Sequence, residues 1–135
     1  MDTVCGIPGS RTEIVMLKPP GDGTRLELSS FVRPDSVPGS PAAMANELGL
    51  RNVAFEVNDL QAAVDWAATE GYGLVGGIGE YEGAWRMAYV RGPEGIIVSL
   101  AERIGRASQR PHLAAMRASA VPNFIKLVHA EGFSP

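Results

Sequence analysis

The stretch from Leu50 to Gly105 carries a strand, a helix and further strands in a fixed order, and this order constrains the fold more than any other feature. Arg51–Val57 alternates apolar and polar residues, as a half-buried strand does. Asn58 or Asp59 can cap a helix directly after it, and Gln61 is placed to help close the capping box. The next apolar residues share one helical face: Leu60, Val64, Ala67 and Ala68.

After this helix the pattern changes to short extended segments separated by turn residues. Gly71 suits the left-handed residue that ends a helix, and Tyr72–Val75 is predicted to be a short strand. Trp85–Arg91 and Ile96–Ala101 are predicted as two further strands, joined by a tight turn at Gly92–Gly95. Between Tyr72–Val75 and Trp85–Arg91, a flexible connection is predicted from its glycines, Gly76, Gly77 and Gly79. The stretch is therefore predicted to be a βαβββ unit.

The chain on the N-terminal side of this unit is predicted to hold a β-hairpin and a linker. Residues 1–12 have the composition of a loop, and Thr12–Lys18 and Arg25–Phe31 are predicted strands around a Pro- and Gly-rich turn at residues 19–23. Residues 32–49 contain the prolines and small residues of a spacer, with one helical turn predicted through Met44–Leu48.

Composition excludes several classes of partner. The formal net charge is −3 and no basic run occurs, which argues against nucleic acid. No apolar stretch approaches the ~20 residues needed to span a bilayer, and the N-terminus lacks a signal-peptide pattern, so we expect a cytoplasmic protein. Cys5 is the single cysteine and is interpreted as a bystander thiol.

Two segments carry a resemblance to a known family: AFEVNDLQAAV at residues 54–64 and RGPEGIIVSLAE at residues 91–102. They resemble the second module of a vicinal oxygen chelate (VOC) domain, the superfamily of glyoxalase I, bleomycin-resistance proteins and extradiol dioxygenases. The resemblance implies an α+β fold in which paired βαβββ modules form a curved mixed sheet. It covers residues 13–105, and the first strand and helix of the first module are missing from it.

This resemblance implies one VOC domain in four parts. Residues 1–31 would be a partial first module made of its two closing strands, and residues 32–49 would be the linker between modules. Residues 50–105 would be the complete second module. Residues 106–135 extend beyond the resemblance and are predicted to be a helical or disordered tail.

Proteins of this superfamily usually hold a divalent metal with histidine and glutamate side chains from both modules. Glu27 matches an acidic ligand position of the first module, and the alternative is an ordinary solvent-facing glutamate. Asn52 stands where the second module's histidine would be, and Ser99 where its glutamate would be. An amide and a hydroxyl are poor ligands for a transition metal. His112 and His129 lie in the tail and are interpreted as surface residues. No cofactor is therefore expected, and a divalent metal only if Glu27 is joined by ligands from elsewhere.

Three residues near the third strand are further candidates for ligand contacts. Arg86 could bind a carboxylate, and Tyr81 precedes it in the same segment. Trp85 and Arg86 lie on opposite faces of their strand, so only one can line the concave side of the sheet. The sequence does not decide which of the two does so. The alternative interpretation is that neither contacts a ligand, with one packed in the core and the other on the surface.

Three functions fit these observations. The first is a metal-independent protein that binds a small organic molecule through Glu27, Asn52, Ser99, Arg86 and Tyr81. The second is a metal-dependent lyase, isomerase or dioxygenase of the same superfamily, and the third is a non-catalytic truncated remnant. We also expect a homodimer, because the apolar face of the first predicted strand (Ile14 and Met16, or Val15 and Leu17) lacks a covering helix. The alternative is that the tail folds back and covers this face with Phe124, Leu127 and Val128.

Overall fold

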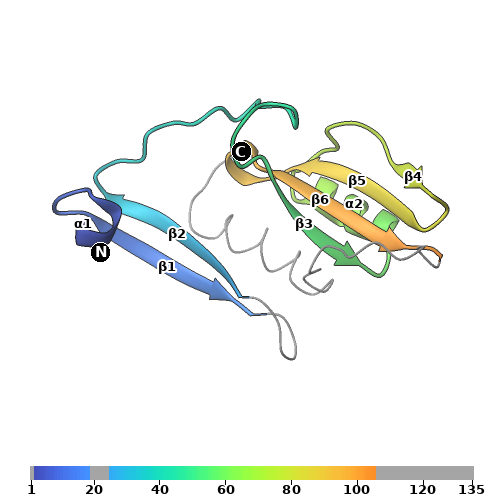
Figure 1. Ribbon diagram of the computed structural model, residues 1–135, viewed down its shortest axis with the longest axis horizontal. Coiled ribbons are helices and arrows are strands. Elements are labelled where there is room, and N and C mark those ends of the chain that lie inside the picture. The colour runs from blue at the N-terminus through green and yellow to red at the C-terminus, as the bar shows by residue number, and fades with distance from the viewer. Residues whose placement is uncertain (1, 19–24, 106–135) are drawn as a thin grey trace.

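A computed structural model describes residues 2–18 and 25–105 of the chain (Figure 1). A short helix and a β-hairpin come first, and a linker leads from them to a βαβββ unit. The elements are α1 (Asp2–Cys5), β1 (Arg11–Leu17), β2 (Leu26–Arg33), β3 (Asn52–Val57), α2 (Leu60–Thr69), β4 (Gly79–Tyr81), β5 (Trp85–Arg91), the 3-10 turn η1 (Pro93–Gly95) and β6 (Ile97–Arg103).

The strands form two hydrogen-bonded sheets. β1 and β2 pair antiparallel, and the other four strands pair in the order β3-β6-β5-β4. β3 and β6 run parallel, whereas β6, β5 and β4 are antiparallel neighbours. The larger sheet is therefore mixed, and Figure 1 shows it twisted and curved with α2 packed on one side. This α+β architecture confirms the predicted fold class.

Three predicted elements of secondary structure are wrong. Residues 72–75 form only an isolated bridge between Leu74 and Val90, and β4 begins later, at Gly79. The linker makes a turn, closed by the Glu47 N–H donating to the Met44 carbonyl at 3.0 Å, rather than the helical turn predicted through Met44–Leu48. Near the N-terminus, α1 occupies part of the segment predicted to be loop.

Both ends of α2 are fixed by side-chain and backbone caps. The Ala62 N–H donates to the Asp59 carboxylate at 2.9 Å, so Asp59 is the N-cap. Gln61 does not close a capping box, since its amide donates instead to Asp65 at 2.9 Å. At the other end Gly71 has a φ of +90°, as predicted. The Tyr72 N–H donates to the Ala67 carbonyl at 2.9 Å, which completes a Schellman ending.

The core lies between α2 and the larger sheet. Side chains of β3, β5 and β6 that point toward α2 are buried with one face of the helix. Leu60, Val64 and Ala67 belong to that face as predicted, but Ala68 is exposed. The hairpin contributes three partly buried leucines that pack against the same core: Leu17, Leu26 and Leu28. In the hairpin register they occupy one face together with Val15, which leaves Ile14 and Met16 on the other.

No helix in the described part of the chain is long and apolar enough to cross a membrane. The predicted hairpin turn at residues 19–23, the tail and both histidines fall outside the described residues.

Candidate functional site

Strand register divides the larger sheet into two faces, and the face opposite α2 is here named the distal face. Its residues lie in four rows that run across neighbouring strands. The first row joins Asn52, Ile97 and Arg91, and the second joins Ala54, Ser99 and Tyr89. The third and fourth rows complete the face: Glu56, Ala101, Met87 and Gly79, then Arg103, Trp85 and Tyr81.

The middle of the distal face is formed by small side chains. Ala54, Ser99 and Ala101 lie next to one another on β3 and β6, and together they are named the small-residue bed. Tyr89 and Met87 of β5 border it. Neighbouring strands are about 4.8 Å apart, and same-face residues along a strand about 6.6 Å apart, so the bed has the dimensions of a small ring. Ser99 contributes a hydroxyl to the bed but is only 3% exposed, whereas the Asn52 amide, one row away, is exposed.

The linker borders the bed at the first row. The Arg91 guanidinium donates to the Ala43 carbonyl at 2.6 Å and to the Gly95 carbonyl at 2.9 Å. Ala43 is buried, and so is Ile97, which lies beside Arg91 in the first row. Arg91 therefore ties the linker to the β5–β6 turn: its Nη1 donates to both carbonyls, and its Nη2 donates to the Met44 sulfur at 3.7 Å.

The opposite border, in the fourth row, is aromatic and charged. The Arg103 guanidinium carbon lies 4.3 Å from the centroid of the Trp85 ring, which is a cation–π arrangement. Arg103 also lies 3.9 Å from the Glu56 carboxylate in the adjacent row. Tyr81 pairs with Trp85 across β4 and β5 and is exposed.

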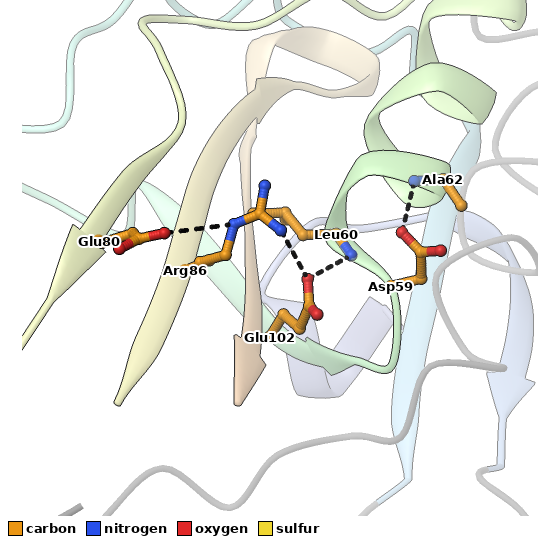
Figure 2. A network of polar contacts seen from close by, with 6 residues as sticks. All are labelled: Asp59, Leu60, Ala62, Glu80, Arg86 and Glu102. Atoms are coloured by element: carbon orange, nitrogen blue, oxygen red, sulfur yellow. Dashed lines mark hydrogen bonds and ion pairs between the residues drawn. The ribbon is translucent and has the colours of Figure 1, made fainter. Parts of the chain in front are cut away.

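Arg86 points to the α2 side of the sheet, as Figure 2 shows, while Trp85 is on the distal face. Its guanidinium lies 3.9 Å from Glu80 and 3.7 Å from Glu102. The Glu102 carboxylate accepts a hydrogen bond of 3.0 Å from the Leu60 N–H, at the first turn of α2. The expectation that Arg86 could contact a small molecule beside Asn52 and Ser99 is corrected accordingly.

Glu27 lies on the exposed face of the hairpin, in register with Met16 and beside Ser29 on its own strand. Within residues 2–18 and 25–105, no group of three or more His, Cys, Asp or Glu side chains is placed to hold a metal ion. At the two positions that the resemblance assigns to ligands of the second module, the side chains are the Asn52 amide and the Ser99 hydroxyl, which do not fit a transition metal. The described residues therefore do not fit the metal centre that the fold implies.

Cys5, at the end of α1, is exposed. Its sulfur is 3.2 Å from the Ser10 hydroxyl, and this hydrogen bond lowers the pKa of the thiol.

The sequence interpretation missed Glu56, Tyr89 and Arg103 as members of this face. Arg103 shares the parity of Ser99 and Ala101, but the predicted strand ended at Ala101. Extending the alternation by two residues would have placed it. The pairing of Arg103 with Trp85 depends on the antiparallel register of β5 and β6, which alternation within one strand does not contain.

Comparison with solved structures finds a crystal structure of a glyoxalase family protein from Bacillus cereus. The TM-score is 0.72 and the sequences are 36% identical, over 77% of this chain and 70% of that protein. No protein-family profile matches the chain, and no curated protein matches it. The structural similarity agrees with the resemblance in residues 54–64 and 91–102.

Proposed function

We propose that this chain, which belongs to the glyoxalase family, binds a small organic molecule on its distal face without a resident transition metal. One observation supports this above all: the register gathers the small-residue bed, two polar groups and three aromatic side chains on the face opposite α2. Small-molecule sites are commonly apolar, with a few polar groups that fix orientation. In this proposal the bed supplies the floor, Tyr89 and Trp85 the apolar border, and Asn52 and Ser99 the hydrogen bonds.

Binding at the bed can be tested by filling it. We expect Ala101→Leu to abolish binding of small aromatic fragments, detected as amide shift changes in NMR spectra of the ¹⁵N-labelled protein. Ala62→Leu adds the same side chain to the exposed surface of α2 and is the matched control. Fragments that shift distal-face amides equally in both variants would contradict the proposed site.

Metal independence is proposed from the chemistry of the donors. Asn52 and Ser99 offer neutral oxygens where a transition metal needs imidazole or carboxylate. Purified protein should hold far less than one equivalent of zinc, nickel, iron or manganese after dialysis. About one tightly held equivalent, measured by elemental analysis, would favour a metal-dependent lyase, isomerase or dioxygenase instead.

Metal independence can also be tested by restoring metal-binding side chains at residues 52 and 99. Asn52→His combined with Ser99→Glu places an imidazole on β3 and a carboxylate on the neighbouring strand β6. If Glu27 converges on them, the double variant should bind a divalent metal measurably by calorimetry. Asn52→His alone is the control and should bind much more weakly. An unchanged affinity would show that the three positions do not converge.

We also propose that the chain forms a homodimer through the exposed face of its hairpin. On that face Ile14 is 42% exposed and Met16 50% exposed. Among the described strands, β1 and β2 pair only with each other, which leaves backbone groups along their edges. Light scattering should give a dimer for the full chain and a monomer for Ile14→Ser with Met16→Ser. Val37→Ser, in the exposed linker, is the control, and a wild-type monomer would contradict the proposal.

A further inference from the structure

We infer that the proposed site takes an organic anion with a flat apolar body, such as an aromatic carboxylate, and that Arg103 recognises its charge. This inference rests on the proposed function, because it assigns a ligand class to the same distal face. The ligand would be negatively charged, and Arg103 would bind its charged group.

The Arg103 guanidinium is held in position but remains accessible. It lies 4.3 Å from the Trp85 ring centroid, so the indole restricts its position. The side chain is still 51% exposed, and its ion-pair partner Glu56 is 3.9 Å away, beyond hydrogen-bonding distance. A guanidinium carries five N–H donors in a planar fork that matches a carboxylate. Arg103 is therefore a positioned cation with donors left for a ligand.

The larger sheet has two further arginines, Arg86 and Arg91, both on β5, whereas Arg103 lies on β6. Arg91 lies in the first row, but its Nη1 donates to the Ala43 and Gly95 carbonyls and its Nη2 to the Met44 sulfur. Arg86 lies on the α2 side, between Glu80 and Glu102. Among the arginines that the structure describes on the larger sheet, Arg103 is the one that combines distal-face placement with an accessible guanidinium. An anion on this face has Arg103 as its partner.

The small-residue bed and the side chains of β5 would hold the body of the ligand. Arg103 follows Ala101 by two residues on the same face of β6, which places it about 6.6 Å along the strand from the bed. Tyr89, Met87 and Trp85 border that path on β5. A flat ring over Ala54 and Ala101 would contact these side chains, and its carboxylate would reach the guanidinium. Aromatic borders favour planar apolar groups through offset or edge-to-face packing.

Glu56 is the charged residue that would oppose an anionic ligand on this face and bind a cationic one. Its carboxylate lies in the third row beside Ala101 and pairs with Arg103, so it competes with an incoming anion. A cationic ligand would reverse the roles, with Glu56 as the anchor and Arg103 as the repelling group. Removing each charge separately therefore distinguishes the two ligand classes.

The experiment titrates the full ¹⁵N-labelled chain with benzoate, benzamide and benzylamine, which share one ring and differ in charge. We expect benzoate to shift the amides of Ala54 and Ala101 and to bind about tenfold tighter than benzamide, as a charge-assisted hydrogen bond allows. Arg103→Gln should reduce benzoate affinity to the benzamide level, and Arg103→Lys should give an intermediate value. Glu56→Gln should raise benzoate affinity severalfold.

Arg11→Gln removes the same charge from the exposed surface of β1 and should leave benzoate binding unchanged. Amide spectra and melting temperatures verify that each variant is folded. Equal binding of benzoate and benzamide would overturn the role of Arg103 while leaving the proposed function intact. Tightest binding of benzylamine would overturn the ligand class. If none of the three probes shifts distal-face amides, the proposed function fails and the inference fails with it.

Discussion

The hairpin and the βαβββ module are built on the same alternating pattern but are held in place very differently. In β6, residues Ile97–Leu100 are all buried. Val98 and Leu100 pack in the core with α2, Ile97 and Ser99 are buried on the distal face, and neighbouring strands flank β6 on both sides. In β1 and β2, inward and outward residues alternate, and only a few leucines contact the core. Alternation therefore specifies a strand, whereas a covering helix and two flanking strands specify a rigid one.

The first prediction concerns the contact through which the linker between the two regions meets the module. Gly95 has a φ of +78°, and a Cβ added there would overlap the backbone of Pro41. Gly95→Val should therefore destabilise the protein by about 2–6 kcal/mol, combining backbone strain with overpacking. Gly77→Val is the matched control, because no atom lies within 4 Å of a Cβ at that position. If denaturant unfolding shows that the variant loses less than about 1 kcal/mol of unfolding free energy, the linker moves aside freely.

The second prediction compares one leucine from each region directly. Leu100 is fully buried, so Leu100→Ala should lower the free energy of unfolding by about 2–5 kcal/mol. Leu28 is only partly buried against the same core, and Leu28→Ala should cost about 1 kcal/mol. Equal losses in urea unfolding would show that the hairpin is as firmly integrated as β6. Hydrogen exchange should also be slower in β6 than in β2.

The fold was predictable to the extent that local patterns determine it. The capped helix, the Gly71 ending and the turn before β6 depend on neighbouring residues, and each was found in the sequence. The segment at residues 72–75 misled because its apolar residues fit a strand, yet the Tyr72 N–H is used by the end of α2. Gly73 and Val75 then make the two hydrogen bonds of a single antiparallel bridge with β5, and pairing resumes at Gly79.

The candidate site was less predictable, because it depends on register between strands. Asn52 and Ser99 could be named from the family resemblance. The side of the sheet taken by Trp85 and Arg86 could not, since the alternation leaves both choices open until β5 is aligned with β6. The role of Glu102 as a cap for α2 joins residues far apart in sequence, and no local pattern contains it.

The third prediction tests how much this long-range cap adds to the module. Glu102→Ala removes the acceptor of the Leu60 N–H and one partner of Arg86, and should destabilise the protein by about 1–2 kcal/mol. Glu80→Ala removes the more exposed partner of Arg86, 3.9 Å away, and should change stability by less than about 0.5 kcal/mol. Thermal unfolding of the two variants gives the comparison. Equal effects would assign the stabilisation to the ion pairs rather than to the cap.

The smallest expected effect lies inside the better-packed region. Tyr72 is 3% exposed, and its hydroxyl is buried without a hydrogen-bond partner among the described residues. A buried hydroxyl without a partner costs free energy, whereas a phenyl ring of the same shape does not. Tyr72→Phe should therefore be neutral or stabilise the protein by up to about 1 kcal/mol at neutral pH. Tyr81→Phe, at an exposed ring, is the control and should have no effect.

The pH dependence of Tyr72 gives a second measurement with a definite sign. Burial, followed by the charges of Glu70 and Glu94, raises the pKa of Tyr72 above its ordinary value. Stability associated with the neutral phenol is present below the unfolded-state pKa of about 10 and is lost as pH rises through the folded-state value. Tyr72→Phe should therefore show a shallower loss of stability above about pH 10 than the wild type. A variant that is destabilised at neutral pH would show that the hydroxyl has a stabilising partner, such as a buried water, and that the module's core is more polar than its side chains indicate.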